Sequence, residues 1–308
     1  MSNSTVLVLF PIAVAIIMLG LGLTLTLDDF RRVVKYPRAM VVCLVCQMLV
    51  LPAICLGLVV AFNLRPELAV GMMLLAASPG GSTSSLYSHL FKGDLALNIS
   101  LSAVNSVLAL FTLPVIVNLS IAGFIGSDKS IGLQFDKVVQ VFALVLIPIA
   151  IGMAVRARFT ATAERLERSV KVLSVFVLLL MVGSVIAGLG RNVFAILGEI
   201  IVAAVAFNLI SMVVGYYAPR LLKVGERRSI ASAFEIGLHN ASLAITIGLS
   251  PTLLNNTLMA MPPVVYGFVM FFTAAGFGFV VSRRVPTLTT VRGGSIEQPG
   301  ASRRRPAA

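Results

Sequence analysis

Apolar residues follow one another in long unbroken runs along most of this chain, and polar residues gather in the short segments between them. Nine of these runs have the length of about twenty residues that a helix needs to cross a bilayer. The expected spans are residues 5–27, 39–62, 68–90, 95–118, 138–156, 170–189, 194–217, 229–250 and 257–282. This pattern predicts an all-α polytopic membrane protein with about nine transmembrane helices.

The composition agrees with a membrane protein and explains the high positive charge. Of the 308 residues, 58% are hydrophobic and 12% are charged, whereas roughly a quarter of an average soluble domain is charged. The net charge of +12 could indicate a nucleic-acid partner. However, twenty of the 24 lysines and arginines follow odd-numbered spans, and only four lie in the opposite loops. This positive-inside pattern predicts a protein of the cell membrane with its N-terminus outside and its C-terminus in the cytoplasm, and no nucleic-acid partner.

Several segments outside the spans have simple expected roles. Residues 285–308 are rich in Pro, Gly, Ser and Arg, and they are expected to form a disordered cytoplasmic tail that at most touches anionic lipid. The segment Thr160–Lys171 is expected to be a short cytoplasmic link between two halves. Cys43, Cys46 and Cys55 fall in one apolar run and are interpreted as packing residues. The chain start lacks a basic n-region and an A-x-A-like site, so the first run is interpreted as a true span.

Two of the nine spans are interrupted by residues that disfavour a helix. The third contains Ser78-Pro-Gly-Gly81, and the eighth contains Gly237 close to three polar residues. Proline removes a backbone donor and glycine weakens a helix. A break at membrane depth is tolerated only where it faces protein or a wet cavity. Two broken spans therefore predict the binding site of a carrier.

The breaks match in position if the chain descends from ten helices and lacks the first. The third span then becomes the fourth of the first five, and the eighth is the fourth of the second five. Gln47 and Asn208 become counterparts in the preceding spans. This pattern predicts an inverted repeat.

Glu235 is the carboxylate that lies deep in a span, and His239 follows it at i+4 on the same helix face. A charge in hydrocarbon costs several kcal/mol, about 3 on insertion scales, so such a residue commonly marks an ion or substrate path. A neutral structural carboxylic acid and a packing histidine are the alternatives. A zinc site needs three or four ligands, and the other histidine, His89, lies near a span end. Neither a metal enzyme nor another intramembrane enzyme is expected, because the sequence contains no Ser–Lys set, paired Asp or His-rich metal set.

Further polar residues lie on neighbouring spans. Asn98, Ser102 and Asn105 form one stripe at i, i+4 and i+7, and Gln47 lies mid-span before Pro52. These residues either bond helices together or face the same cavity as the breaks. Oxygen-rich side chains around one carboxylate suit a hard cation such as sodium. Half-helix N-termini suit the carboxylate of an organic anion, which predicts coupled transport of the two.

Five motifs together resemble the bile acid:sodium symporter family, close to its bacterial members, over nearly the whole chain up to about Arg284. The motifs are Gly20-Leu-Gly-Leu-Thr-Leu, Gln47 followed by Leu51-Pro52, Ser78-Pro-Gly-Gly81, Lys92-Gly-Asp-Leu-Ala-Leu97 and Glu235-Ile-Gly-Leu-His-Asn240. The resemblance implies a transmembrane domain over residues 1–284 that contains a core (39–118 and 194–282) with two crossed broken helices. It also implies a panel domain formed by residues 5–27 and 138–189.

The resemblance also implies two sodium sites and no other cofactor. The implied ligands of the first site are Ser84, Ser85, Asn98, Ser102 and Glu235. The implied ligands of the second are Gln47, Glu235, His239 and the backbone carbonyls of Ile236 and Leu238. The implied substrate contacts are Ser82, Thr83, Asn240 and Met270.

The chain departs from the family pattern at several of these positions. His239 replaces the usual glutamine, which leaves proton coupling open, and Ser85 and Asn98 replace the family's asparagine and serine. Met270-Phe271 replaces a His-Asn pair of bacterial members, so bile acid is not the expected substrate. The predicted function is sodium-coupled import of a small organic anion by alternating access, without an obligate protein partner. A proton-coupled or exporting carrier and a gated channel are the alternatives.

Overall fold

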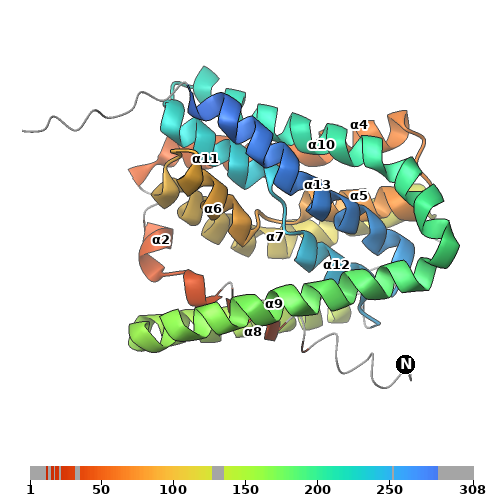
Figure 1. Ribbon diagram of the computed structural model, residues 1–308, viewed down its shortest axis with the longest axis horizontal. Helices are drawn as coiled ribbons and strands as arrows, with labels where there is room; N and C mark the ends of the chain where they lie inside the picture. The colour runs from red at the N-terminus through yellow and green to blue at the C-terminus, as the bar shows by residue number, and fades with distance from the viewer. Residues whose placement is uncertain are drawn as a thin grey trace, which may run out of the picture.

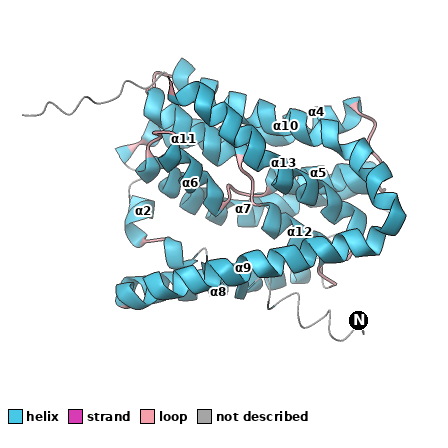
Figure 2. Cartoon of the chain, viewed as in Figure 1, coloured by secondary structure: helices cyan, strands magenta, loops and turns pink. Residues whose placement is uncertain are grey.

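The computed structural model is helical throughout the residues that it describes, apart from loops and one isolated two-residue bridge (Figures 1 and 2). It describes residues 12–31 with gaps at 13–14, 17 and 21, and then 35–126, 135–251 and 253–283. The helices are α2 (Leu27–Arg31), α3 (Pro37–Val45), a π-helical turn (Cys46–Val50), α4 (Leu51–Ala61), α5 (Pro66–Ala77), α6 (Ser82–Leu90), α7 (Leu95–Phe124), α8 (Phe135–Arg158), α9 (Thr160–Leu189), a 3₁₀ turn (Gly190–Asn192), α10 (Val193–Leu221), α11 (Glu226–Gly237), α12 (Ala241–Leu249) and α13 (Thr257–Ser282).

Four described helical segments are long and apolar enough to cross a membrane: Pro37–Ala61, α7, α10 and α13. Their outer faces carry exposed large apolar side chains such as Leu119 and Phe268, with exposed fractions of 68% and 70%. In water such a surface would be unfavourable, whereas lipid solvates it. The all-α class is therefore confirmed over the described residues. The first expected span is described only in part, and the expected tail at 285–308 lies wholly outside the described residues.

Both helix breaks occur where the sequence predicts them. Helix α5 ends at Ala77 because Ser78 is extended (φ −72°, ψ 144°), the conformation that a residue before proline prefers. Helix α6 restarts at Ser82. Helix α11 ends at Gly237, and α12 begins after Asn240, whose Oδ1 accepts a hydrogen bond of 3.1 Å from Leu243 N–H. Asparagine is a favoured N-cap for this reason.

The two breaks cross and satisfy each other's backbone groups. Gly81 N–H donates to the Leu238 carbonyl at 2.7 Å, and Asn240 N–H donates to the Pro79 carbonyl at 2.8 Å. Gly80 and His239 form the antiparallel bridge between these two bonds. Away from water an unpaired backbone group is costly, so each break provides the partners that the other needs.

The connection between α8 and α9 differs from the prediction. The segment Thr160–Lys171 is not a loop but the beginning of α9, and Phe159 alone joins the two helices. The segment is rich in Ala, Glu, Arg and Leu, which favour helices, and the Arg156 guanidinium at the end of α8 lies 3.5 Å from the Glu167 carboxylate. Figure 1 shows α8 and α9 together along one side of the molecule, with α10, α11 and α13 on the opposite side.

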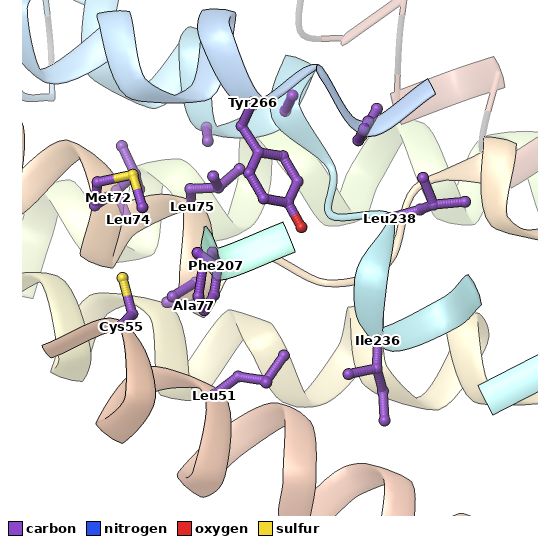
Figure 3. Close-up of a cluster of buried hydrophobic side chains, with 14 of the residues drawn as sticks. Leu51, Cys55, Met72, Leu74, Leu75, Ala77, Phe207, Ile236, Leu238 and Tyr266 are labelled. Atoms are coloured by element: carbon purple, nitrogen blue, oxygen red, sulfur yellow. The ribbon is translucent and has the colours of Figure 1, made fainter. Parts of the chain in front are cut away.

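A buried apolar cluster surrounds the crossing (Figure 3). In that view Tyr266 of α13 lies above Phe207 of α10, and the two ring centroids are 5.9 Å apart. Leu51, Cys55, Leu75, Ile236 and Leu238, from α4, α5, α11 and the second break, belong to the same cluster. This packing holds the backbone at the crossing away from lipid.

Candidate functional site

The carboxylate of Glu235 is the centre of the candidate site. Glu235 lies in the last turn of α11 and is 2% exposed. Its carboxylate packs directly on the first break, because a Cβ atom added to Gly80 would lie 2.2 Å from Glu235 Oε1. A side chain at position 80 would therefore displace the carboxylate, and glycine is needed here for the close approach.

Hydroxyl and amide groups of α6 and α7 surround one carboxylate oxygen. Ser84 Oγ donates to Glu235 Oε2 at 2.8 Å, and Ser102 Oγ donates to the same oxygen. Asn98 Oδ1 lies 3.1 Å from Ser84 Oγ and 2.8 Å from Ser85 Oγ. The structure therefore brings all five predicted ligands of the first site into one connected group of oxygen atoms.

The orientation of the Asn98 amide follows from its second contact. Asn98 Nδ2 donates to the Ala231 carbonyl at 3.0 Å, one turn before Glu235 on α11. A backbone carbonyl can only accept, so the amide nitrogen must face it and Oδ1 must face the serines. The amide thus presents an oxygen to the group of hydroxyls around Glu235.

The charge of Glu235 has no compensating partner within the described residues. None of the ion pairs in the described part of the chain includes Glu235, and its Oε1 atom is buried without a hydrogen-bond partner. A buried ionised carboxylate is strongly unfavourable unless a positive charge accompanies it. Hard cations prefer carboxylate, carbonyl and hydroxyl oxygens, so this arrangement is suited to a small cation.

Gln47 and His239 form a second polar group beside the crossing. Gln47 Nε2 donates to the Ser78 carbonyl at 3.0 Å, and His239 Nδ1 lies 3.2 Å from the same carbonyl and 3.3 Å from Gln47 Nε2. The imidazole ring stacks on Phe207 at 5.3 Å and meets Tyr266 edge-on. Gln47 Oε1 and His239 Nε2 are buried without a partner among the described atoms.

The second predicted ligand set is only partly assembled. Gln47 and His239 contact each other, but no hydrogen bond within the described part of the chain joins either of them to Glu235. The Leu238 carbonyl already accepts a hydrogen bond from Gly81, and Ile236 is buried. Gln47 lies in the π-helical turn before Pro52, where Leu51 N–H bonds back five residues to Cys46. Such π turns are frequent at functional sites.

The predicted substrate contacts lie near the breaks but do not form one cluster. Thr83 is partly buried in the first turn of α6, and the Asn240 amide oxygen caps α12, which leaves its nitrogen for another contact. Met270 is buried on α13. The side chain of Ser82 lies outside the described part of the structure. No hydrogen bond between described atoms links Thr83, Asn240 and Met270.

Three residues around the second break were not predicted as part of a site. Asn208 Nδ2 and Tyr266 Oη both donate to the Gly237 carbonyl at 2.7 Å, and Thr273 Oγ1 donates to Asn208 Oδ1. The comparison of the two halves of the sequence gave Asn208 only as the counterpart of Gln47. An asparagine in an apolar span was the available signal, whereas Tyr266 and Thr273 gave none.

Comparison with known proteins supports the resemblance. The model of the Sodium Bile acid symporter family matches residues 11–196, which is more than half of the chain. The chain belongs to this family. The family is one of membrane transporters, so the chain is an integral membrane protein and not an enzyme, as predicted.

Three relatives of this symporter-family chain are similar to it in sequence over most of its length. The uncharacterized sodium-dependent transporter YocS of Bacillus subtilis is 28% identical over 220 residues, 71% of this chain and 67% of YocS. The human ileal sodium/bile acid cotransporter is 26% identical over 254 residues, 81% of this chain and 72% of that protein. The rice chloroplastic probable sodium/metabolite cotransporter BASS2 is 26% identical over 238 residues, 77% of this chain and 55% of that protein.

The family match and the geometry inform different parts of the site. The matched residues include the first break and the serines of α6 and α7, and they end before α11. The position of Glu235 against Gly80 comes from the structure alone.

Proposed function

We propose that this chain is a secondary active transporter that couples sodium to the movement of a small organic anion by alternating access. The observation that carries the proposal is the buried carboxylate of Glu235, which lies among serine and asparagine oxygens where two broken helices cross. The names of the relatives, a sodium-dependent transporter and sodium cotransporters, support sodium as the coupling ion.

The first sodium site would use Glu235 with Ser84, Ser85, Asn98 and Ser102. The hydroxyls of Ser84 on α6 and Ser102 on α7 donate to Glu235 Oε2. Each hydroxyl oxygen also has lone pairs, so rotation of the O–H bonds would turn the same oxygens toward a cation. The cation would then provide the positive charge that the carboxylate lacks.

A second sodium site would use Gln47, His239, Glu235 and the Ile236 and Leu238 carbonyls. The unpartnered Gln47 Oε1 supports it, because a buried acceptor without a donor is suited to an ion. The unpartnered imidazole nitrogen of His239 favours proton coupling as the second candidate for this position.

The organic anion would bind beside the crossing. Helices α6 and α12 both begin there, and the partial positive charge at their N-termini would attract a carboxylate. Ser82, Thr83 and Asn240 would contact this head group. Met270 would offer an apolar surface in place of the polar pair of bacterial members.

The proposed transmembrane domain has nine spans arranged as an inverted repeat, and two parts of it would move against each other during transport. Helices α5 to α7 and α11 to α13 follow the same order of broken helix and long helix. Residues 39–118 and 194–282 would form the core, and residues 5–27 and 138–189 the panel. Motion of one against the other would expose the crossing to each side in turn. The basic loops would place the C-terminus in the cytoplasm of a cell-membrane protein.

Uptake into proteoliposomes tests this proposal. Vesicles containing the full chain receive labelled small carboxylates under an inward sodium gradient, an inward proton gradient or neither, with the membrane voltage clamped. We expect accumulation above equilibrium under the sodium gradient alone. Accumulation only under the proton gradient would favour proton coupling. Equilibration without accumulation under every gradient would contradict coupled transport.

A further inference from the structure

Asn208 forms a buried network that ties the end of the Glu235 helix to two neighbouring helices. Its amide nitrogen and the Tyr266 hydroxyl both donate to the Gly237 carbonyl, each at 2.7 Å, and Thr273 donates to the Asn208 oxygen. Asn208 and Tyr266 are fully buried. The Gly237 carbonyl can only accept, so the amide nitrogen must face it and the amide oxygen must face Thr273.

Two donors occupy the last carbonyl of α11. The last carbonyls of a helix have no partner within the helix, and in an apolar interior they need one from outside. With two hydrogen bonds the Gly237 carbonyl has both lone pairs engaged, so it is not available to an ion. The network therefore fixes the position of α11, and its atoms do not bind an ion directly.

The position of this carbonyl controls the position of Glu235. Glu235 and Gly237 lie in the same last turn of α11, and the carboxylate tolerates little displacement because it packs against Gly80. The backbone at Gly237 packs on Met212, since an added Cβ would lie 2.2 Å from Met212 Cγ. Helix α10 thus contacts the last turn both through packing and through the Asn208 amide.

The first break has a corresponding contact. Gln47 Nε2 donates to the carbonyl of Ser78, the residue that follows α5, as Asn208 Nδ2 donates to the carbonyl of Gly237 at the end of α11. Each amide comes from the helix that precedes its broken helix. Both carbonyls accept a second contact from the second half of the chain, from His239 and Tyr266 respectively.

We propose that Asn208, supported by Tyr266 and Thr273, is a positioning residue that sets the sodium affinity of the Glu235 site by holding the last turn of α11. This inference rests on the proposed sodium coupling. Loss of the amide would let the turn shift and would separate the carboxylate from Ser84 and Ser102. Substitutions of residues that orient a metal ligand commonly weaken metal affinity by about 10- to 100-fold.

Sodium-dependent thermal stabilisation of the purified full chain tests the inference without substrate. The variants are Asn208→Leu, which removes both amide contacts, and Tyr266→Phe, which removes one donor to Gly237 and keeps the ring. The control is Ser100→Ala, because Ser100 is fully buried on α7 and its hydroxyl donates only to the Ala96 carbonyl. Sodium chloride is titrated against choline chloride at constant ionic strength.

We expect the half-saturating sodium concentration to rise about tenfold in Asn208→Leu and about threefold in Tyr266→Phe, because loss of a residue that orients a metal ligand weakens metal affinity. The sodium concentration needed for a given stabilisation should rise by the same factor, because the stabilisation grows as RT ln(1 + [Na+]/Kd). Ser100→Ala should leave the half-saturating concentration within about twofold. A purely structural role would lower the melting temperature without moving this concentration.

Different results would overturn the inference and the proposed function. Folded Asn208→Leu and Tyr266→Phe variants with the parent's half-saturating concentration would overturn the positioning role alone. If Asn208→Leu fails to fold, Tyr266→Phe decides the question in the same way. A parent chain that sodium does not stabilise, and that shows no sodium-driven uptake, would overturn sodium coupling and the inference with it.

Discussion

The two helix breaks perform complementary tasks with different residues. The first, Ser78–Gly81, carries no ionisable side chain, and its glycine at position 80 leaves room for a carboxylate. The second follows Glu235 and contains His239 and Asn240, so it provides the charge and most of the polar side chains. Neither break is therefore a site alone. One provides the space and the other provides the group that fills it.

The backbone of the two breaks is more alike than their side chains. Each donates one N–H to a carbonyl of the other, at 2.7 Å and 2.8 Å, and each has a carbonyl bonded by an amide from the preceding helix. Polar backbone at membrane depth must be satisfied in every such break. The side chains are free to differ because they are not needed for that purpose.

The largest expected effect comes from removing the negative charge of Glu235, which lies just before the second break. Glu235→Gln keeps an oxygen that can accept from Ser84 and Ser102 but removes the negative charge that attracts the cation. We expect at least about a hundredfold loss of sodium-driven uptake, because one partner of a buried ion pair contributes about 3–5 kcal/mol. Uptake into proteoliposomes measures the loss, and an unchanged melting temperature without sodium shows that the variant folds. Sodium-driven uptake at the parent rate would contradict the assigned role.

A smaller effect is expected from filling the space of the first break. Gly80→Ala places a Cβ 2.2 Å from Glu235 Oε1, whereas Gly81→Ala meets nothing closer than the His239 carbonyl at 3.4 Å. Overpacking costs about 1–3 kcal/mol, so we expect the half-saturating sodium concentration to rise roughly ten- to hundredfold in Gly80→Ala. Gly81→Ala is the matched control and should change it by less than about threefold. Equal effects of the two substitutions would show that the close approach at Gly80 has no special importance.

The smallest effect should come from removing one of the several hydroxyl groups at the proposed sodium site. Ser102→Ala removes one donor to Glu235 Oε2 and leaves the donor from Ser84. A hydrogen bond to a charged group contributes about 1.5–3 kcal/mol, so we expect the half-saturating sodium concentration to rise about tenfold. Ser100→Ala, two residues earlier on α7, removes a hydrogen bond to a backbone carbonyl and should leave the half-saturating sodium concentration nearly unchanged. Sodium titration of uptake distinguishes the two variants, and equal responses would remove Ser102 from the site.

Local rules made much of the fold predictable. Proline, glycine and the lengths of the apolar runs act over a few residues, so both breaks and most helix positions followed from the sequence. The prediction of a loop at Thr160–Lys171 was wrong, because the Ala, Glu, Arg and Leu residues of this charged segment favour a helix. The site was predictable as a set of polar residues in apolar helices, but not as a set of contacts.

Three properties can be read from the amino-acid sequence: the chain is a helical membrane protein of the symporter family, two of its helices break, and Glu235 lies near one break. These properties depend on backbone chemistry and apolar length, which act locally along the chain. The tertiary structure is needed to show that Ser84 contacts a carboxylate 151 residues away, that Gly80 faces the same carboxylate, and that Asn208 donates to the Gly237 carbonyl at the end of the helix that carries it. Such contacts depend on how distant helices pack, and the spacing of residues along the chain does not contain that information.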